Sequence, residues 1–301
     1  MAHNKTGMNF KPLINKLGLG VLTLGEKWFR IPNVAKAEKR GASLTRLVGK
    51  LDKKHRLQTV ANLKLAFPEK TDSERAEIAK GMYNHFGYII ADFVRGSIRS
   101  DEEYLSTTTV EGEEYFDQAL SEGKGVLLVT AHLGNWERFG HWFSLKKVPV
   151  SGVARDANDD EITQRVTKIR GERGARMLSR GKAAREMLVR LKAGEVIFIL
   201  PDQNADDAFI PFFDKPAGTA LGPAVIHIKT HAPILPACML RTGPGTYHIV
   251  FREALKVREG EKAEELMTRV NAEIEAMIRL APEQYLWMHD RWRNARRKGL
   301  L

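Results

Sequence analysis

The 301-residue chain contains a single cysteine, Cys238, which lies in the apolar run 234–240. One cysteine cannot form an internal disulfide, so the sequence is typical of a protein of a reducing compartment, with this thiol packed in the core. No apolar run reaches the length of about 18 residues that a membrane-spanning helix needs, and no signal peptide with a small-residue cleavage site is evident. These absences exclude a disulfide-stabilised secreted domain and a protein built from spanning helices.

Acidic residues are scarce relative to basic ones. The chain has 48 Lys and Arg against 37 Asp and Glu, which gives a formal net charge of +11. A field of this sign attracts nucleic acid, anionic lipid surfaces or acidic proteins. Charge alone does not choose among these partners, so the choice must come from the residues that carry chemistry.

Short apolar runs alternate with helical patterns over most of the chain. The runs predicted as strands are 126–130, 148–154, 196–200, 234–240 and 247–251. Helical spacing is predicted over 76–93, 117–122, 136–143, 161–173, 182–193, 223–230 and 261–280. This alternation predicts an α/β fold, in which a central, mostly parallel sheet is flanked by helices on both faces.

The first sixty residues differ from the rest in being basic and rich in glycine. Apolar residues from Phe10 to Leu24 follow helical spacing with lysines between them, while glycines weaken the helix on its own. Such a stretch either lies in a membrane interface or packs on the protein's own core, and the sequence leaves both open. We therefore divide the chain into an N-terminal helical, membrane-associating segment, 1–60, and a larger domain, 61–301.

The most informative segment for function is 125–137, where a predicted buried strand ends at Ala131-His132 and a helix begins at Trp136. His132 and Glu137 flank the glycine-containing turn between them. Open α/β sheets bind their ligands at such strand ends. A histidine oriented by a carboxylate can take a proton from an alcohol. On its own the pair is a weak signal, since a capping histidine and a surface glutamate have the same spacing.

Other candidate sites are weaker. The spacing of His132 and Glu137 does not match the His-Glu-x-x-His zinc motif, and the pair His227 and His231 has no third ligand at suitable spacing. Cys238 lies in an apolar run and makes a poor nucleophile. We therefore expect neither a metal site nor a covalent acyl-enzyme.

The context of His132 resembles a known family. The segment 130–137 resembles the His-x4-(Asp/Glu) block of the lysophospholipid acyltransferase superfamily, and is most similar to its bacterial lipid A late acyltransferase branch (lauroyl and myristoyl transferases). Further blocks match in the same order, namely 61–69, Arg155 with Asn158 and then Arg170, 200–203 followed by 211–219, and 285–292. Two residues depart from the family pattern: Asp214 replaces a usual glycine, and Asn158 comes one position early.

The resemblance implies a role for each matching residue. His132 would be the general base on the acceptor hydroxyl, and Glu137 would orient it. Arg170 would offset charge on the thioester oxygen or hold a phosphate of the acceptor, and Asp202 would orient Arg170 or another donor. The remaining matches imply substrate-binding positions at Arg155, Asn158 and Gln203.

The resemblance also implies the reaction. A fatty acyl group would pass from a thioester of acyl carrier protein or coenzyme A to a hydroxyl of a glycolipid, a lipid A precursor, with no bound cofactor. The protein would work at the cytoplasmic face of the bacterial inner membrane, and its basic surface would attract the acidic carrier rather than nucleic acid. Two alternatives stay open: acyl transfer to another lipid (a phosphatidylinositol mannoside or an amino-acid lipid), and a non-catalytic basic protein that binds membranes or nucleic acid.

Overall fold

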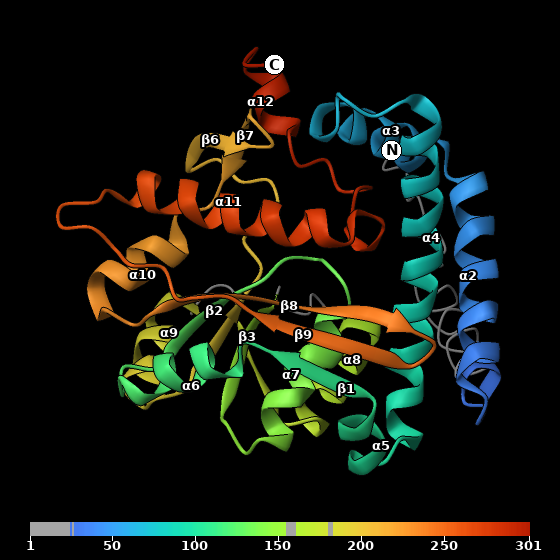
Figure 1. Cartoon of the computed structure of the whole chain (residues 1–301), viewed down its shortest axis with the longest axis horizontal. Helices are drawn as coiled ribbons and strands as arrows, with labels where there is room; N and C mark the ends of the chain where they lie inside the picture. Colours follow the sequence, from blue (N-terminus) through green and yellow to red (C-terminus); the bar gives the residue numbers. More distant parts are fainter. Residues whose placement is uncertain (1–24, 26, 155–160, 180–182) are drawn as a thin grey trace, which may run out of the picture.

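The computed structural model describes residues 25, 27–154, 161–179 and 183–301. The apolar stretch from Phe10 to Leu24, and the expected site residues Arg155 and Asn158, lie outside the described residues. The rest of the chain forms an α/β structure in which helices cover a central sheet on both faces (Figure 1).

The central sheet has seven strands in the order β1-β9-β8-β2-β5-β3-β4. Every neighbouring pair in it is parallel except β8 with β9. A separate antiparallel hairpin joins β6 to β7. The strand bounds are β1 Thr108–Glu111, β2 Val126–Val129, β3 Val150–Ala154, β4 Ala175–Ser179, β5 Val196–Ile199, β6 Ala208–Phe212, β7 Lys215–Thr219, β8 Ile234–Gly243 and β9 Thr246–Phe251.

The α-helices of the described residues are α2 Val34–Leu51, α3 Lys53–Ala66, α4 Asp72–Arg95, α5 Asp101–Ser106, α6 Glu113–Ser121, α7 Trp136–Leu145, α8 Glu161–Glu172, α9 Ala183–Lys192, α10 Gly222–Thr230, α11 Ala263–Leu280 and α12 Arg293–Arg297. None of them is both long enough and apolar enough to cross a membrane. Short 3-10 turns lie at Gly96–Ile98 and Pro282–Gln284.

The two faces of the sheet carry separate hydrophobic cores because successive side chains of a strand point to opposite sides. In β2, Val126 and Leu128 pack with aromatic residues of α6 and α7. Leu127 and Val129 pack on the other side with residues of α9, α10 and α11. The prediction of helices on both faces of a mostly parallel sheet is thus confirmed.

The N-terminal helices α2, α3 and α4 stand at one edge of the molecule, where α2 and α4 run side by side (Figure 1). The cation-rich residues 36–56 belong to α2 and α3. Helix α3 runs through residue 60, where the predicted division of the chain falls. The division itself stays a prediction.

The structure corrects several local expectations. Strands β1, β4, β6 and β7 were not predicted. In β6 and β7, Pro211, Pro216 and Gly218 hide the hairpin from a strand pattern. Asp214 lies at the tip of that hairpin with φ of +57°, a left-handed conformation that suits glycine and that aspartate tolerates better than most residues. This explains how Asp214 can replace the glycine of the family pattern.

Candidate active site

Two neighbouring parallel strands end at the site. β2 and β5 pair in register, with Val129 opposite Ile199. His132 follows the carboxyl end of β2 and Asp202 follows the carboxyl end of β5, so both residues lie at the same edge of the sheet. This is where α/β folds place their ligands.

Asp202 holds the imidazole of His132. Its Oδ1 lies 2.9 Å from Nδ1 of the ring, and its Oδ2 accepts the backbone N–H of His132 at 3.0 Å. A carboxylate accepts only, so Nδ1 donates and the neutral ring leaves Nε2 as a proton acceptor. The side-chain amide nitrogen of Gln203 lies 3.4 Å from Nε2. The arrangement therefore fixes the tautomer that a general base requires.

The electrostatics of the pair favour the charged form of both partners. Burial lowers the pKa of His132, but the hydrogen-bonded Asp202 and the nearby Glu137 outweigh it, so the pKa is raised above its ordinary value. Burial raises the pKa of Asp202, but its interactions with His132 outweigh burial and lower it. An imidazolium formed at His132 would be stabilised where it stands.

Glu137 contacts a different partner. It lies in the first turn of α7, which begins at the capping residue Asn135, and its carboxylate forms a two-pronged ion pair with Arg170 of α8. Arg170 donates from Nε at 2.9 Å and from Nη2 at 2.5 Å. No hydrogen bond joins Glu137 to His132 among the described residues.

These contacts correct the expected roles of the two carboxylates. Asp202, rather than Glu137, orients His132, because the neighbouring parallel strand ends beside it. Glu137, rather than Asp202, orients Arg170, because the carboxylate in the first turn of α7 lies against the guanidinium from α8. Glu137 acts on His132 through charge alone.

A cavity of about 990 Å³ adjoins both pairs. His132, Glu137, Arg170 and Gln203 line it at one side, together with Arg173. Apolar side chains from β4, β5 and helices α8 to α10 line much of the rest; they include Val166, Met177, Met187, Phe198, Leu200 and Ile226. A pocket of this size with a few polar groups suits a ligand that is mostly hydrocarbon and has one polar end.

Comparison with known proteins agrees with this description. The family model of the bacterial lipid A biosynthesis acyltransferase matches residues 13–294. The chain belongs to this family. It is therefore an acyltransferase of the late lipid A type.

The lipid A relatives are distant in sequence but cover most of the chain. It is 27% identical over 258 residues to the lipid A biosynthesis lauroyltransferase of Escherichia coli, covering 84% of each chain. It is 23% identical over 245 residues to the lipid A biosynthesis acyltransferase of Haemophilus influenzae, covering 80% of this chain and 76% of that one. A phosphatidylinositol mannoside acyltransferase of Mycobacterium tuberculosis is 27% identical over 133 residues, 42% of each chain.

In the acyltransferase, the C-terminal segment fixes the loop that carries His132. The N–H of Leu286 donates to the carbonyl of His132 at 3.1 Å, and the N–H of Gly134 donates to the carbonyl of Gln284 at 3.1 Å. Gly134 has φ of +58°, and a Cβ there would lie 1.9 Å from the carbonyl oxygen of Met239. Only glycine fits this position, which explains its place in the turn.

The outer sequence blocks brace that segment rather than line the cavity. Asn62 donates from Nδ2 to the carbonyls of Trp287, at 2.8 Å, and His289, at 2.6 Å. Phe67 packs edge-on against Trp287. Arg291, fully buried, donates to the carbonyl of Gly218 and to Thr219 in β7. His289 is the exception, since it also lines the cavity.

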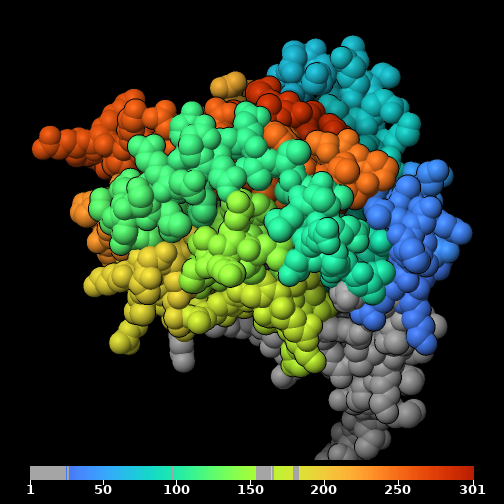
Figure 2. All heavy atoms as spheres, turned by 60° about the horizontal axis from the view of Figure 1, so that its bottom comes forward, coloured from blue at the N-terminus to red at the C-terminus, as the bar shows by residue number. Residues whose placement is uncertain are grey.

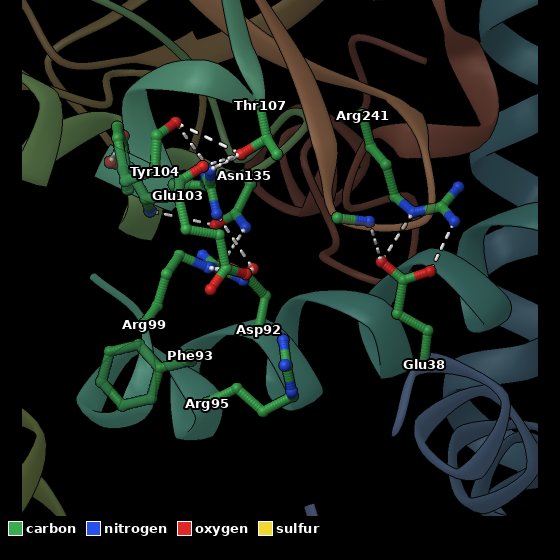
Figure 3. Close-up of polar contacts among 12 residues, drawn as sticks. Glu38, Asp92, Phe93, Arg95, Arg99, Glu103, Tyr104, Thr107, Asn135 and Arg241 are labelled. Carbon is green, nitrogen blue, oxygen red and sulfur yellow. Dashed lines mark hydrogen bonds and ion pairs between the residues drawn. The ribbon is translucent and has the colours of Figure 1, made fainter. Parts of the chain in front are cut away.

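A buried polar cluster that the sequence did not predict lies beneath the turn (Figure 3). Asp92 of α4 accepts from Nδ2 of Asn135 at 2.9 Å, and also from Arg99 and Arg138. The guanidinium of Arg138 lies between the rings of Tyr104 and Tyr247. Because Asn135 caps α7, this cluster fixes the start of the helix that carries Glu137. No local pattern around Asp92 indicates a contact so distant in sequence.

The described residues contain no group of three or more His, Cys, Asp or Glu side chains arranged to hold a metal ion. Cys238 is buried in β8, and burial raises the pKa of its thiol to about 12. A thiol in that state is a poor nucleophile.

Proposed function

We propose that this acyltransferase moves a fatty acyl group from a thioester, of acyl carrier protein or coenzyme A, to a hydroxyl of a lipid A precursor. The observation that carries the proposal is the Asp202-oriented ring of His132 at the polar side of a largely apolar cavity. The names of the relatives support the acceptor, since they act in lipid A biosynthesis.

His132 acts as the general base. Its Nε2 takes the proton of the acceptor hydroxyl as the oxygen attacks the thioester carbonyl carbon, so the O–H bond breaks and a C–O bond forms. The C–S bond then breaks, and the imidazolium returns the proton to the leaving sulfur. Asp202 holds the tautomer and stabilises the imidazolium. The reaction needs no cofactor, and none is expected.

Arg170 supplies positive charge at the same place. Glu137 occupies its Nε and Nη2, which holds the guanidinium in one orientation and leaves Nη1 for the substrate. That donor can meet the developing charge on the carbonyl oxygen or a phosphate of the acceptor. Gln203, and Arg155 and Asn158 from outside the described residues, complete the proposed substrate-binding set.

The partners follow from charge and substrate. A chain with a net charge of +11 attracts the acidic carrier protein and anionic lipids. Because the acceptor is a membrane lipid, we place the enzyme at the cytoplasmic face of the bacterial inner membrane, with no role for nucleic acid.

The test is acyl transfer by the purified enzyme. A mixture of acyl-carrier-protein and acyl-CoA donors of several chain lengths is supplied with a lipid A precursor, and products are identified by mass spectrometry. His132→Ala should lower turnover on the order of 10²–10⁴-fold, the usual contribution of a general base. The control is His248→Ala, since His248 of β9 contacts Thr109 and Glu111 at the surface, outside the cavity lining.

Two outcomes would contradict the proposal. Unchanged turnover in His132→Ala would remove the general base. Transfer to a phosphatidylinositol mannoside acceptor alone would overturn the choice of lipid A and favour the alternative that the mycobacterial relative suggests.

A further inference from the structure

The inner face of α2 is locked to the rest of the protein. Gly41 meets Gly87 of α4 so closely that a Cβ at Gly41 would lie 2.0 Å from the carbonyl oxygen of Gly87. Glu38 is buried and accepts from Arg241 Nε at 3.2 Å and from the backbone N–H of Gly245 at 3.0 Å (Figure 3). These contacts fix the rotation of α2 about its axis, and therefore fix what its opposite face presents.

That opposite face is apolar and open. Leu44, Leu47, Val48 and Leu51 recur at the spacing of one helical stripe, and all four are exposed, Leu47 by 53% and Leu51 by 77%. In the space-filling view the blue segment that contains α2 forms one rim of the molecule (Figure 2). An outward stripe of this kind is unusual on a soluble surface and indicates a binding face.

The next helix continues the pattern. In α3, Leu57 is exposed by 58% and Val60 by 40%. We call the four residues of the α2 stripe together with these two the α2–α3 apolar face.

Cations outnumber acids in the segment that carries this face. Residues 34–60 contain eight Lys and Arg side chains and only two acidic ones. Of the two, Glu38 is buried against Arg241, and Asp52 caps α3 and contacts His55. In these contacts neither acid neutralises a surface lysine of the two helices. The surface combines exposed hydrocarbon with a clear excess of positive charge.

We propose that the α2–α3 apolar face docks on the anionic surface of a lipid bilayer. Its leucines would enter the boundary between headgroups and acyl chains, while the flanking Lys and Arg side chains would reach the phosphates. An acidic protein partner would match the charge but not a stripe of aliphatic side chains free of acids. The inference rests on the proposed function insofar as the acceptor lies in that bilayer, and it places the docking face in a described part of the chain.

The test is flotation of the full-length protein with vesicles of phosphatidylglycerol mixed into phosphatidylcholine, or of phosphatidylcholine alone. Wild type should prefer the anionic vesicles, and high salt should weaken its binding. The double variant Leu47→Gln, Leu51→Gln should bind at least about tenfold more weakly. The matched control is Val189→Gln, Ile228→Gln, which alters similarly exposed side chains on α9 and α10, at the other end of the molecule (Figure 1).

Activity separates this inference from the proposed function. The Leu47/Leu51 variant should keep wild-type turnover on acceptor dispersed in detergent and lose it on acceptor embedded in vesicles. If neither wild type nor the variant transfers acyl groups, the proposed function fails, while flotation still tests the docking face.

Three results would overturn the docking face itself. The Leu47/Leu51 variant could bind vesicles as well as wild type does, or the control variant could lose binding equally. The Leu47/Leu51 variant could also fail to form a dimer that wild type forms, while its vesicle binding stays unchanged.

Discussion

Two groups of carboxylates and guanidinium groups lie on either side of the turn at Gly134. On the cavity side, Glu137 pairs with Arg170, and their own side chains are 14% and 29% exposed. On the buried side, Asp92 pairs with Arg138, and their own side chains are 6% and 1% exposed. The residue types are the same, yet Glu137 and Arg170 line the 990 Å³ cavity, whereas Asp92 and Arg138 line only a much smaller pocket beside Arg99 and His141.

The difference lies in what each pair leaves free. Asp92 meets Asn135, Arg99 and Arg138, and Arg138 also donates to Thr107 and to the carbonyl of Tyr104. Most polar atoms of this buried group are paired within the protein; Arg138 Nε is buried and has no hydrogen-bond partner among the described residues. Arg170, in contrast, gives Nε and Nη2 to Glu137, while its Nη1 makes no hydrogen bond to the described residues and the side chain lines the cavity. An ion pair that retains a donor can serve a substrate, whereas a closed one serves stability.

The largest expected effect separates the two pairs directly. Asp92→Ala should lower the free energy of unfolding by about 3–5 kcal/mol, because it leaves two buried guanidinium groups without their acid. Glu137→Ala should lower it by only about 1 kcal/mol, and should instead reduce kcat/KM on the order of 100-fold. Chemical denaturation and steady-state kinetics measure the two quantities.

Glu77→Ala provides the control for the first effect, since Glu77 lies on the same helix α4 but is exposed and pairs with the equally exposed Lys80. Its unfolding free energy should match wild type. If Asp92→Ala unfolded no more readily than Glu77→Ala, the buried cluster would not be structural, and the contrast between the two sides would fail.

The sequence predicts the cavity side better than the buried side, for a physical reason. The strand, the glycine turn and the first turn of α7 are consecutive in the chain, so residues 126–143 carry their own pattern. The pairing of His132 with Asp202 depends on β2 and β5 being neighbours, and strand order is a property of the whole sheet. The expected roles of Asp202 and Glu137 were exchanged for this reason.

The buried cluster gives no local signal at all. Asp92 sits in α4 among helical residues, and its contact with Asn135 spans 43 residues. The hairpin β6–β7 was not predicted because prolines interrupt its strands. Packing in the folded protein stabilises these strands despite the low strand propensity of their residues. Packing between distant segments therefore decides what pattern alone does not.

The next effect compares two histidines beneath and beside the turn. His85 of α4 is buried and donates to the carbonyl of Gly134, and burial lowers its pKa to about 4. The unfolded chain, with a pKa near 6.5, binds more protons than the folded one between these values. Stability contributed by neutral His85 is therefore present above about pH 6.5 and lost as pH falls toward 4, by about 3 kcal/mol.

Urea unfolding of wild type and His85→Gln across this pH range measures the effect. The variant should be less stable at neutral pH, and its difference from wild type should shrink toward pH 4. His132 should act with the opposite sign, because its raised pKa gives stability at low pH that is lost as pH rises through the folded value. An unchanged difference at all pH values would contradict the role given to His85.

The smallest effect tests the two guanidinium groups themselves. Arg170→Lys keeps the charge but loses the two-pronged geometry toward Glu137, so kcat/KM should fall about tenfold, the equivalent of one charged hydrogen bond of about 1.5 kcal/mol. Arg138→Lys should leave kcat/KM per folded molecule unchanged and lower the Tm, since a lysine cannot lie flat between Tyr104 and Tyr247. Lys168→Gln, on the exposed face of α8, serves as the control for the helix. Should Arg170→Lys change only the Tm, or Arg138→Lys only the kinetics, the division between an open pair for substrate and a closed pair for stability would be wrong.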